Sequence, residues 1–124
     1  MRHARCEAGF RHLSHIRDAT RRIQEYTQGG QTAFMDSALI QDAVIRNLEI
    51  IGEATKALSP EFRAKHPSIP WSSMAGMRDV LIHGYMGVDL EIVWDVVSVR
   101  LNPIVEEIEQ LLDETKNRKE DNDK

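Results

Sequence analysis

Apolar residues recur along this chain at intervals of three, four and seven, the spacing that places them on one face of an α-helix. The pattern predicts a first helix over residues 9–28, which Gly29 and Gly30 end. Its apolar face is expected to hold Phe10, Leu13, Ile16, Ile23 and Tyr26. The alternating apolar and polar runs that are typical of strands are missing from the sequence. The chain is therefore predicted to be all-α.

A second long helix is predicted over residues 37–58, and a connector follows it. The connector, residues 60–70, contains three prolines and leaves room for one helical turn at residues 61–65. A third helix is expected to open at Pro70, because proline is favoured at the first helical position, and to stop near Gly84.

The last long helix is predicted to start after Asp89, whose carboxylate suits an N-cap. Pro103 lies inside this helix and should kink it or split it in two, since proline has no N–H to donate. These elements predict a bundle of four main helices in one domain over residues 10–114. Residues 1–9 are expected to be a flexible N-terminal extension, and the charged residues 115–124 a disordered tail.

Composition narrows the class of protein. The chain has 124 residues, and its one cysteine, Cys6, excludes an internal disulfide and a cysteine zinc cluster. No apolar run approaches the roughly 20 residues of a membrane-spanning helix. The N-terminal segment also lacks the apolar centre of a secretory signal. We therefore expect a cytoplasmic protein that does not enter the membrane.

Charge is distributed unevenly along the sequence. The formal net charge is −4, yet residues 1–30 carry six arginines against three acidic residues. A basic first helix of this kind can contact phosphates or an acidic protein surface. The simpler interpretation, which we favour, is a solvated arginine face.

One short segment, MRDVLIHGY at residues 77–85, concentrates side chains that support chemistry, namely Arg78, His83 and Tyr85. At about 100° per residue, Arg78 and His83 point about 140° apart on an ideal helix. They converge only if the helix unwinds near Gly84 or if a second chain completes the site. The sequence shows no paired carboxylates, glycine-rich phosphate loop or metal-ligand cluster, so neither a metal nor another cofactor is expected.

An arginine and a histidine suffice for RNA cleavage without a metal. Histidine titrates near neutral pH and can take the proton of a ribose 2′-hydroxyl, which then attacks the adjacent phosphate. Arginine can stabilise the resulting phosphorane with two hydrogen bonds. The spacing alone favours a plainer alternative, in which His83 caps a helix and Arg78 lies on the surface.

The string Arg78-x-x-x-x-His83-x-Tyr85 resembles the R-x-x-x-x-H-x-Y signature of HepT-like proteins in the HEPN superfamily. Two longer stretches, IRNLEIIGEA at residues 45–54 and HPSIPW…MRDVLIHGY at residues 66–85, are similar as well. The similarity extends over roughly residues 11–112. It implies an all-α HEPN bundle of four to five helices and a symmetric homodimer, with the two motifs meeting in a cleft across the two-fold axis.

The resemblance implies a role for each residue of the motif. Arg78 would stabilise the transition state, His83 would be the general acid or base, and Tyr85 would receive AMP from an antitoxin. Asp79 stands where the family often has Asn or Asp and would orient Arg78 or His83. Glu53 would be either a buried polar anchor facing the motif helix or an exposed glutamate.

HepT-like proteins are RNA-cleaving toxins, and their antitoxins are MntA-like nucleotidyltransferases. The resemblance implies an RNA substrate, the same kind of partner and silencing by AMP on Tyr85, whose added charge and bulk would repel RNA. An alternative from another class is a non-catalytic HEPN dimer that binds a nucleotide or the nucleotidyltransferase and recognises only phosphate.

Overall fold

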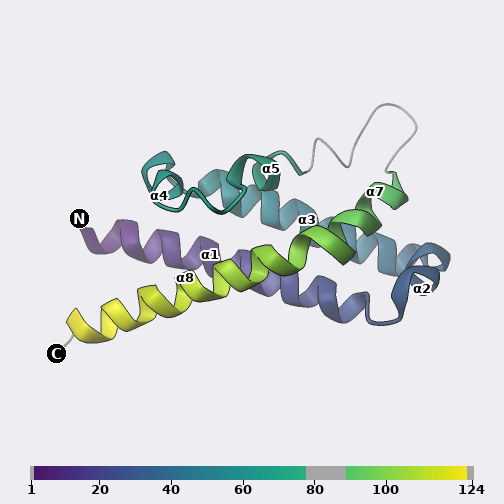
Figure 1. The fold of residues 1–124 in the computed structure, drawn as a ribbon, viewed down its shortest axis with the longest axis horizontal. Coiled ribbons are helices and arrows are strands. Elements are labelled where there is room, and N and C mark those ends of the chain that lie inside the picture. Colours follow the sequence, from purple (N-terminus) through teal and green to yellow (C-terminus); the bar gives the residue numbers. More distant parts are fainter. Residues whose placement is uncertain (1, 78–88, 123–124) are drawn as a thin grey trace.

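The fold is all-α over the residues that this computed structural model describes, as the sequence predicted. These are residues 2–77 and 89–122 for the backbone, and residues 9–77 and 89–114 for the side chains. The helices are α1 (Arg2–Tyr26), α2 (Gly30–Asp36), α3 (Ala38–Ala57), α4 (Pro60–Ala64), α5 (Trp71–Ala75), α7 (Leu90–Asp95) and α8 (Leu101–Asn122), with a π-helical segment, η1 (Val96–Arg100), between the last two (Figure 1).

Three long elements build the bundle. Helices α1 and α3 run side by side, and the continuous rod of α7, η1 and α8 packs across them (Figure 1). The short helices α4 and α5 lie toward the end where α3 finishes, and α5 packs on α3. Helix α2 lies at the opposite end and contacts α3 and α7.

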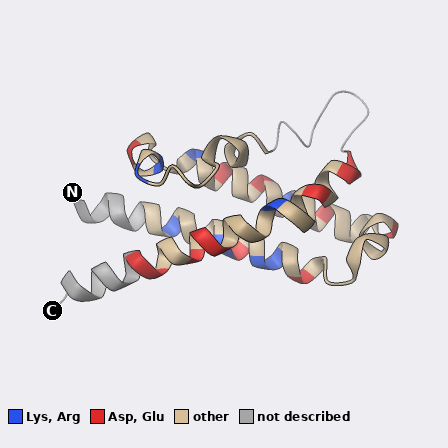
Figure 2. Cartoon of the chain, in the orientation of Figure 1, with Lys and Arg blue, Asp and Glu red and all other residues tan. Residues whose placement is uncertain are grey.

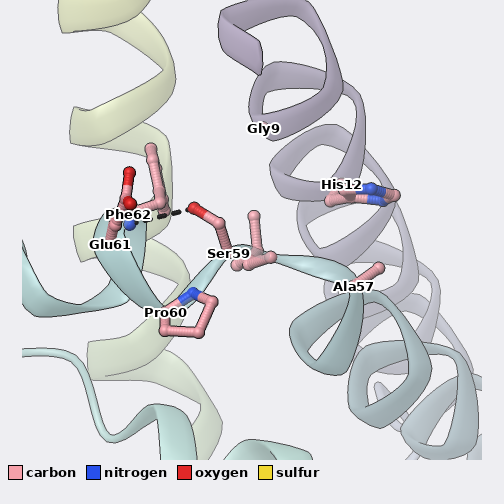
Figure 3. Close-up of a pocket in the computed structure, with 8 residues that line it drawn as sticks. Gly9, His12, Ala57, Ser59, Pro60, Glu61 and Phe62 are labelled. Carbon is pink, nitrogen blue, oxygen red and sulfur yellow. Dashed lines mark hydrogen bonds between the residues drawn. The ribbon is translucent and has the colours of Figure 1, made fainter.

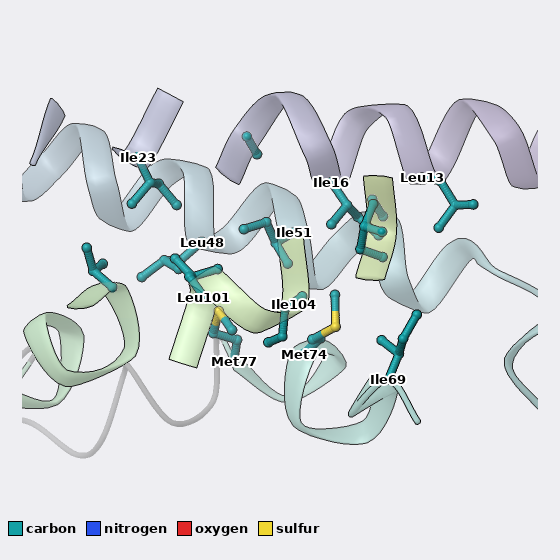
Figure 4. Close-up of a cluster of buried hydrophobic side chains, with 14 of the residues drawn as sticks. Leu13, Ile16, Ile23, Leu48, Ile51, Ile69, Met74, Met77, Leu101 and Ile104 are labelled. Atoms are coloured by element: carbon teal, nitrogen blue, oxygen red, sulfur yellow. The ribbon is translucent and has the colours of Figure 1, made fainter. Parts of the chain in front are cut away.

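One apolar core joins the long helices. Figure 4 shows part of this cluster of buried side chains. The core residues drawn there include Leu13, Ile16 and Ile23 of α1, Leu48 and Ile51 of α3, Met74 of α5, and Leu101 and Ile104 of α8. The predicted stripe on α1 is thus confirmed in its middle. Its end positions, Phe10 and Tyr26, are 38% and 37% exposed, whereas the small side chains of Ala19 and Thr20 are fully buried between the helices.

Side-chain caps begin three helices near the positions that the sequence predicted. Ser37 Oγ accepts the Ile40 N–H at 3.2 Å and starts α3. Ser59 Oγ accepts the Phe62 N–H at 3.1 Å and starts α4, which is the single turn expected in the connector. Asp89 Oδ1 accepts the N–H groups of the second and third residues of α7 at 3.0 and 3.3 Å, so the predicted N-cap is confirmed.

The last helix is not split at Pro103, but a π-helical segment interrupts its α-helical pattern just before this residue. The N–H of Leu101 donates to the carbonyl of Val96, five residues earlier, instead of the carbonyl four residues earlier. Pro103 cannot donate to the carbonyl of Val99, which therefore has no helical partner at that position. The wider π turn accommodates this defect just before the proline.

The third helix differs from the prediction. Helix α5 begins at Trp71, as predicted, but it ends at Ala75, and Met77 is helical again after Gly76. The predicted end near Gly84 lies outside the residues that the structure describes. Gly76 is the C-cap, with φ −85° and ψ 3°, and its N–H still donates to the carbonyl of Ser72 at 3.0 Å.

Both terminal segments continue helices of the core. Helix α1 begins at Arg2, within the predicted extension, and α8 continues to Asn122, within the predicted tail. The described segments include no helix long and apolar enough to cross a membrane. The domain boundaries at residues 10 and 114 stay predictions.

Candidate functional site

The motif itself, with Arg78, Asp79, His83 and Tyr85, falls in residues 78–88, outside the residues that the structure describes. What the structure does describe is the framework on both sides. Helix α5 and Met77 precede the motif, and Asp89 and α7 follow it. Both flanks are attached to the core, through Met74 and Met77 before the motif and through Val93 after it.

Three buried side chains hold α5 and the residue that leads into the motif. Trp71, Met74 and Met77 all belong to the core, and Met74 is fully buried. The indole Nε1 of Trp71 donates to the carbonyl of His66 at 2.9 Å, which ties the helix to the connector before it. Phe62 adds an edge-on contact to Trp71, with ring centroids 6.2 Å apart. Trp71 therefore packs in the core next to the segment that leads into the motif.

On the far side of the motif, α7 is held just as closely. Asp89 caps the helix, and Val93 is fully buried one turn later. The ring of Trp94 lies 5.4 Å from that of the buried Phe34, which links α7 to α2. Residues 78–88 therefore connect two anchored points of the same core.

Glu53 is exposed on α3, while its neighbours Gly52 and Ala54 are buried. Of the two alternatives for this residue, the exposed glutamate is the one that the single chain shows. Elsewhere on α3, Arg46 Nη1 contacts Glu49 Oε2 at 3.5 Å, and residues three apart on a helix are within reach of each other.

The arginine face predicted on α1 is largely paired within the fold. Arg21 Nη2 donates to Glu109 Oε1 of α8 at 2.8 Å, and Arg22 Nε donates to the buried Asn47 Oδ1 of α3 at 2.7 Å. Arg17 pairs with its neighbour Asp18. Arg21 and Arg22 therefore connect helices as well as facing solvent. The sequence did not predict this, because the partners are distant along the chain.

Other cations lie without side-chain partners within the part of the chain that the structure describes. Basic residues lie at the end of the bundle that holds the start of α1 and helix α4, whereas acidic residues are spread along α8 (Figure 2). These cations are Arg11, Lys56, Arg63 and Lys65. The Nε of Arg63 is buried and has no hydrogen-bond partner.

A groove of about 350 Å³ opens at the same end of the bundle, between the start of α1 and the turn from α3 into α4 (Figure 3). His12 and Gly9 line one wall, and Leu58, Pro60 and Phe62 are among the residues of the other. Partial burial lowers the pKa of His12, and the neighbouring His15 and Arg11 lower it further. Within the described ranges, no three His, Cys, Asp or Glu side chains are placed to hold a metal ion.

Comparison with known proteins places these features in a family. Residues 16–111 match the family model described as "Ribonuclease HepT-like", which includes the motif segment. A protein of Thermococcus cleftensis named "Probable ribonuclease HepT" is 42% identical over 103 residues, covering 81% of this chain and 92% of that protein. The chain therefore belongs to the ribonuclease HepT-like family, as the motif indicated.

A second relative is longer than this chain. The Methanocaldococcus jannaschii protein named "Gamma-glutamylcyclotransferase and putative RNase" is 46% identical over 112 residues. These residues are 87% of this chain but only 50% of the relative, so the chain spans half the length of that protein. No solved structure matches the chain significantly.

Proposed function

We propose that this protein is the toxin of a toxin–antitoxin pair and acts as a metal-independent endoribonuclease. The observation that carries the proposal is the family match over residues 16–111, together with the intact Arg78, His83 and Tyr85 inside it. The anchored flanks support it, because a catalytic segment needs fixed ends to hold its groups in a reactive geometry. The substrate is RNA.

In the proposed reaction, His83 takes the proton of a ribose 2′-hydroxyl, and the oxygen attacks the adjacent phosphorus. Arg78 stabilises the charge of the phosphorane. The bond to the 5′-oxygen then breaks, and that oxygen takes up a proton, which leaves a 2′,3′-cyclic phosphate and a free 5′-hydroxyl. Asp79 orients Arg78 or His83.

The proposed active form is a symmetric homodimer in the cytoplasm. Arg78 and His83 point about 140° apart on an ideal helix, so one helical motif does not bring both to one phosphate. Two chains related by a two-fold axis supply converging pairs. An MntA-like nucleotidyltransferase silences the enzyme by forming a phosphodiester between AMP and the Tyr85 hydroxyl, with pyrophosphate leaving from ATP.

The decisive experiment is cleavage of a mixed-sequence RNA in EDTA. We expect the unmodified protein to cut the RNA, and Arg78→Ala and His83→Ala each to lower the rate by at least about 100-fold, the lower range for a general base. His15→Ala and Arg100→Ala are matched controls, since both side chains are exposed, and they should keep the rate within about twofold.

The silencing step is tested in the same preparations by intact mass. Co-expression with the nucleotidyltransferase should add whole AMP units and abolish cleavage, whereas Tyr85→Phe should stay unmodified and active. If unmodified protein leaves all RNAs intact, the nuclease proposal is wrong. Saturable binding of ATP, AMP or the nucleotidyltransferase without scission would then establish the non-catalytic dimer.

A further inference from the structure

At Gly52 of α3, the backbone of α5 lies close to the helix. A Cβ at this position would lie 3.3 Å from the carbonyl oxygen of Met74 and 3.6 Å from that of Ala75. The first distance is shorter than ordinary van der Waals contact. Both oxygens belong to the backbone at the C-terminal end of α5, so they cannot swing away as the tip of a flexible side chain would.

The conformation of Gly52 does not require glycine. It lies inside a regular helix, and its φ is in the ordinary negative range, unlike that of Gly30 at +87°. Glycine in a helix interior is less stable than alanine, because its backbone is freer in the unfolded chain. The close approach of α5 is therefore the physical reason that accounts for glycine at this position.

The neighbours of the contact leave α5 little room to retreat. Met74 is fully buried in the core, and Trp71 and Met77 are nearly so. Helix α5 has five residues, so a displacement of Met74 and Ala75 moves its whole C-terminal turn. Met77 comes two residues after Ala75, and Arg78 follows it directly.

We propose that Gly52 is a positioning residue for the motif: its missing side chain sets the distance from α3 at which α5 ends and Met77 leads into the motif. This inference rests on the proposed ribonuclease function and deepens it. Gly52 touches no substrate and acts through the backbone of α5. The sequence held a signal for it, since glycine inside a helical apolar run is less stable than alanine and so points to a packing or functional reason.

The test is Gly52→Ala, assayed with the same RNA in EDTA. The added methyl must push the α5 carbonyls away by a few tenths of an ångström. Because misplacing a catalytic group by about 1 Å can cost about 100-fold, we expect kcat to fall by about tenfold. KM should change by less than about twofold, because RNA binding uses contacts along the whole phosphate backbone.

Two control variants separate positioning from stability. Gly9→Ala brings the same gain in helix propensity, but its Cβ meets the Phe62 ring at an ordinary 3.7 Å, so kcat should not change. Ala54→Gly weakens α3 near the same turn without adding any atom, so it should lower the melting temperature and leave kcat within about twofold.

Each outcome decides a different point. A selective loss of kcat in Gly52→Ala, absent from both controls, supports the positioning role. If Gly52→Ala cleaves like wild type, or if it loses activity only in proportion to its melting temperature as Ala54→Gly does, the positioning role is wrong and the nuclease stands. Failure of Gly52→Ala to fold would assign the glycine to the fold alone. An inert wild-type protein overturns the nuclease and the positioning role together.

Discussion

At the scale of single residues, one buried amide connects the two central helices. Asn47 of α3 is 6% exposed, and both ends of its side chain are hydrogen-bonded. Its Oδ1 accepts from Arg22 Nε at 2.7 Å, and its Nδ2 donates to the carbonyl of Ala43 at 2.8 Å. A buried polar group is stabilising only while its partners remain, so this amide holds α1 and α3 in register.

Asn47→Ala should therefore destabilise the fold by about 1–3 kcal/mol, because it removes both bonds and leaves part-buried Arg22 without its acceptor. The free energy of urea unfolding measures the loss. Gln24→Ala is the matched control, since Gln24 makes an exposed hydrogen bond to Asn102 at 2.9 Å. We expect the control to change stability by less than about 0.5 kcal/mol. Equal effects of the two variants would contradict a special role for Asn47.

At the scale of elements, three helices start where a side chain satisfies the first free N–H groups, namely those capped by Ser37, Ser59 and Asp89. The cap by Asp89 was predicted from the sequence, because a cap and its helix are neighbours along the chain. The π-helical segment before Pro103 has an equally local cause. The end of α5 at Ala75 was not predicted, since the apolar spacing continues past Gly76.

Asp89→Ala tests the cap that restarts the helix after the motif. Removing the carboxylate leaves the N–H groups of Glu91 and Ile92 without their acceptor, and we expect a loss of about 1 kcal/mol in unfolding free energy. Asp95→Ala removes the same group from an exposed pair with Arg100 and should cost less than about 0.5 kcal/mol. Chemical denaturation compares the two. A loss no larger than the control would show that the cap contributes nothing.

At the scale of the whole molecule, the bundle leaves several large apolar side chains exposed. They are Leu39 at the start of α3, Ile92 of α7 and Val99 of η1, besides the two end positions of the α1 stripe. Isolated exposed apolar residues are common on protein surfaces. In a chain for which a shared cleft is proposed, they are candidates for burial between two copies.

Sedimentation equilibrium tests the proposed homodimer directly. We expect a mass twice the 14.2 kDa of one chain, unchanged on dilution through the concentrations used for RNA cleavage. A mass of one chain under conditions in which RNA is cut would contradict a cleft built from two motifs. Dissociation on dilution with a parallel loss of cleavage would instead support it.

The sequence by itself determined the helical class, the bounds of α3 to within a residue, the cap at Asp89 and a disturbance of the helix near Pro103. Each follows from periodicity or from a side chain bonded to its own near neighbours, so a single stretch of chain contains the whole cause. The motif and the family were equally readable, because the residues that carry them are close together in the sequence.

Only the tertiary structure decided which residues meet across the bundle. Arg21 with Glu109, Arg22 with Asn47, and Gly52 beneath the carbonyls of α5 join segments far apart in the chain. Such contacts depend on how the helices pack, and helical spacing alone is compatible with many packings. For the same reason, the choice between a buried and an exposed side chain at position 53 required the folded chain.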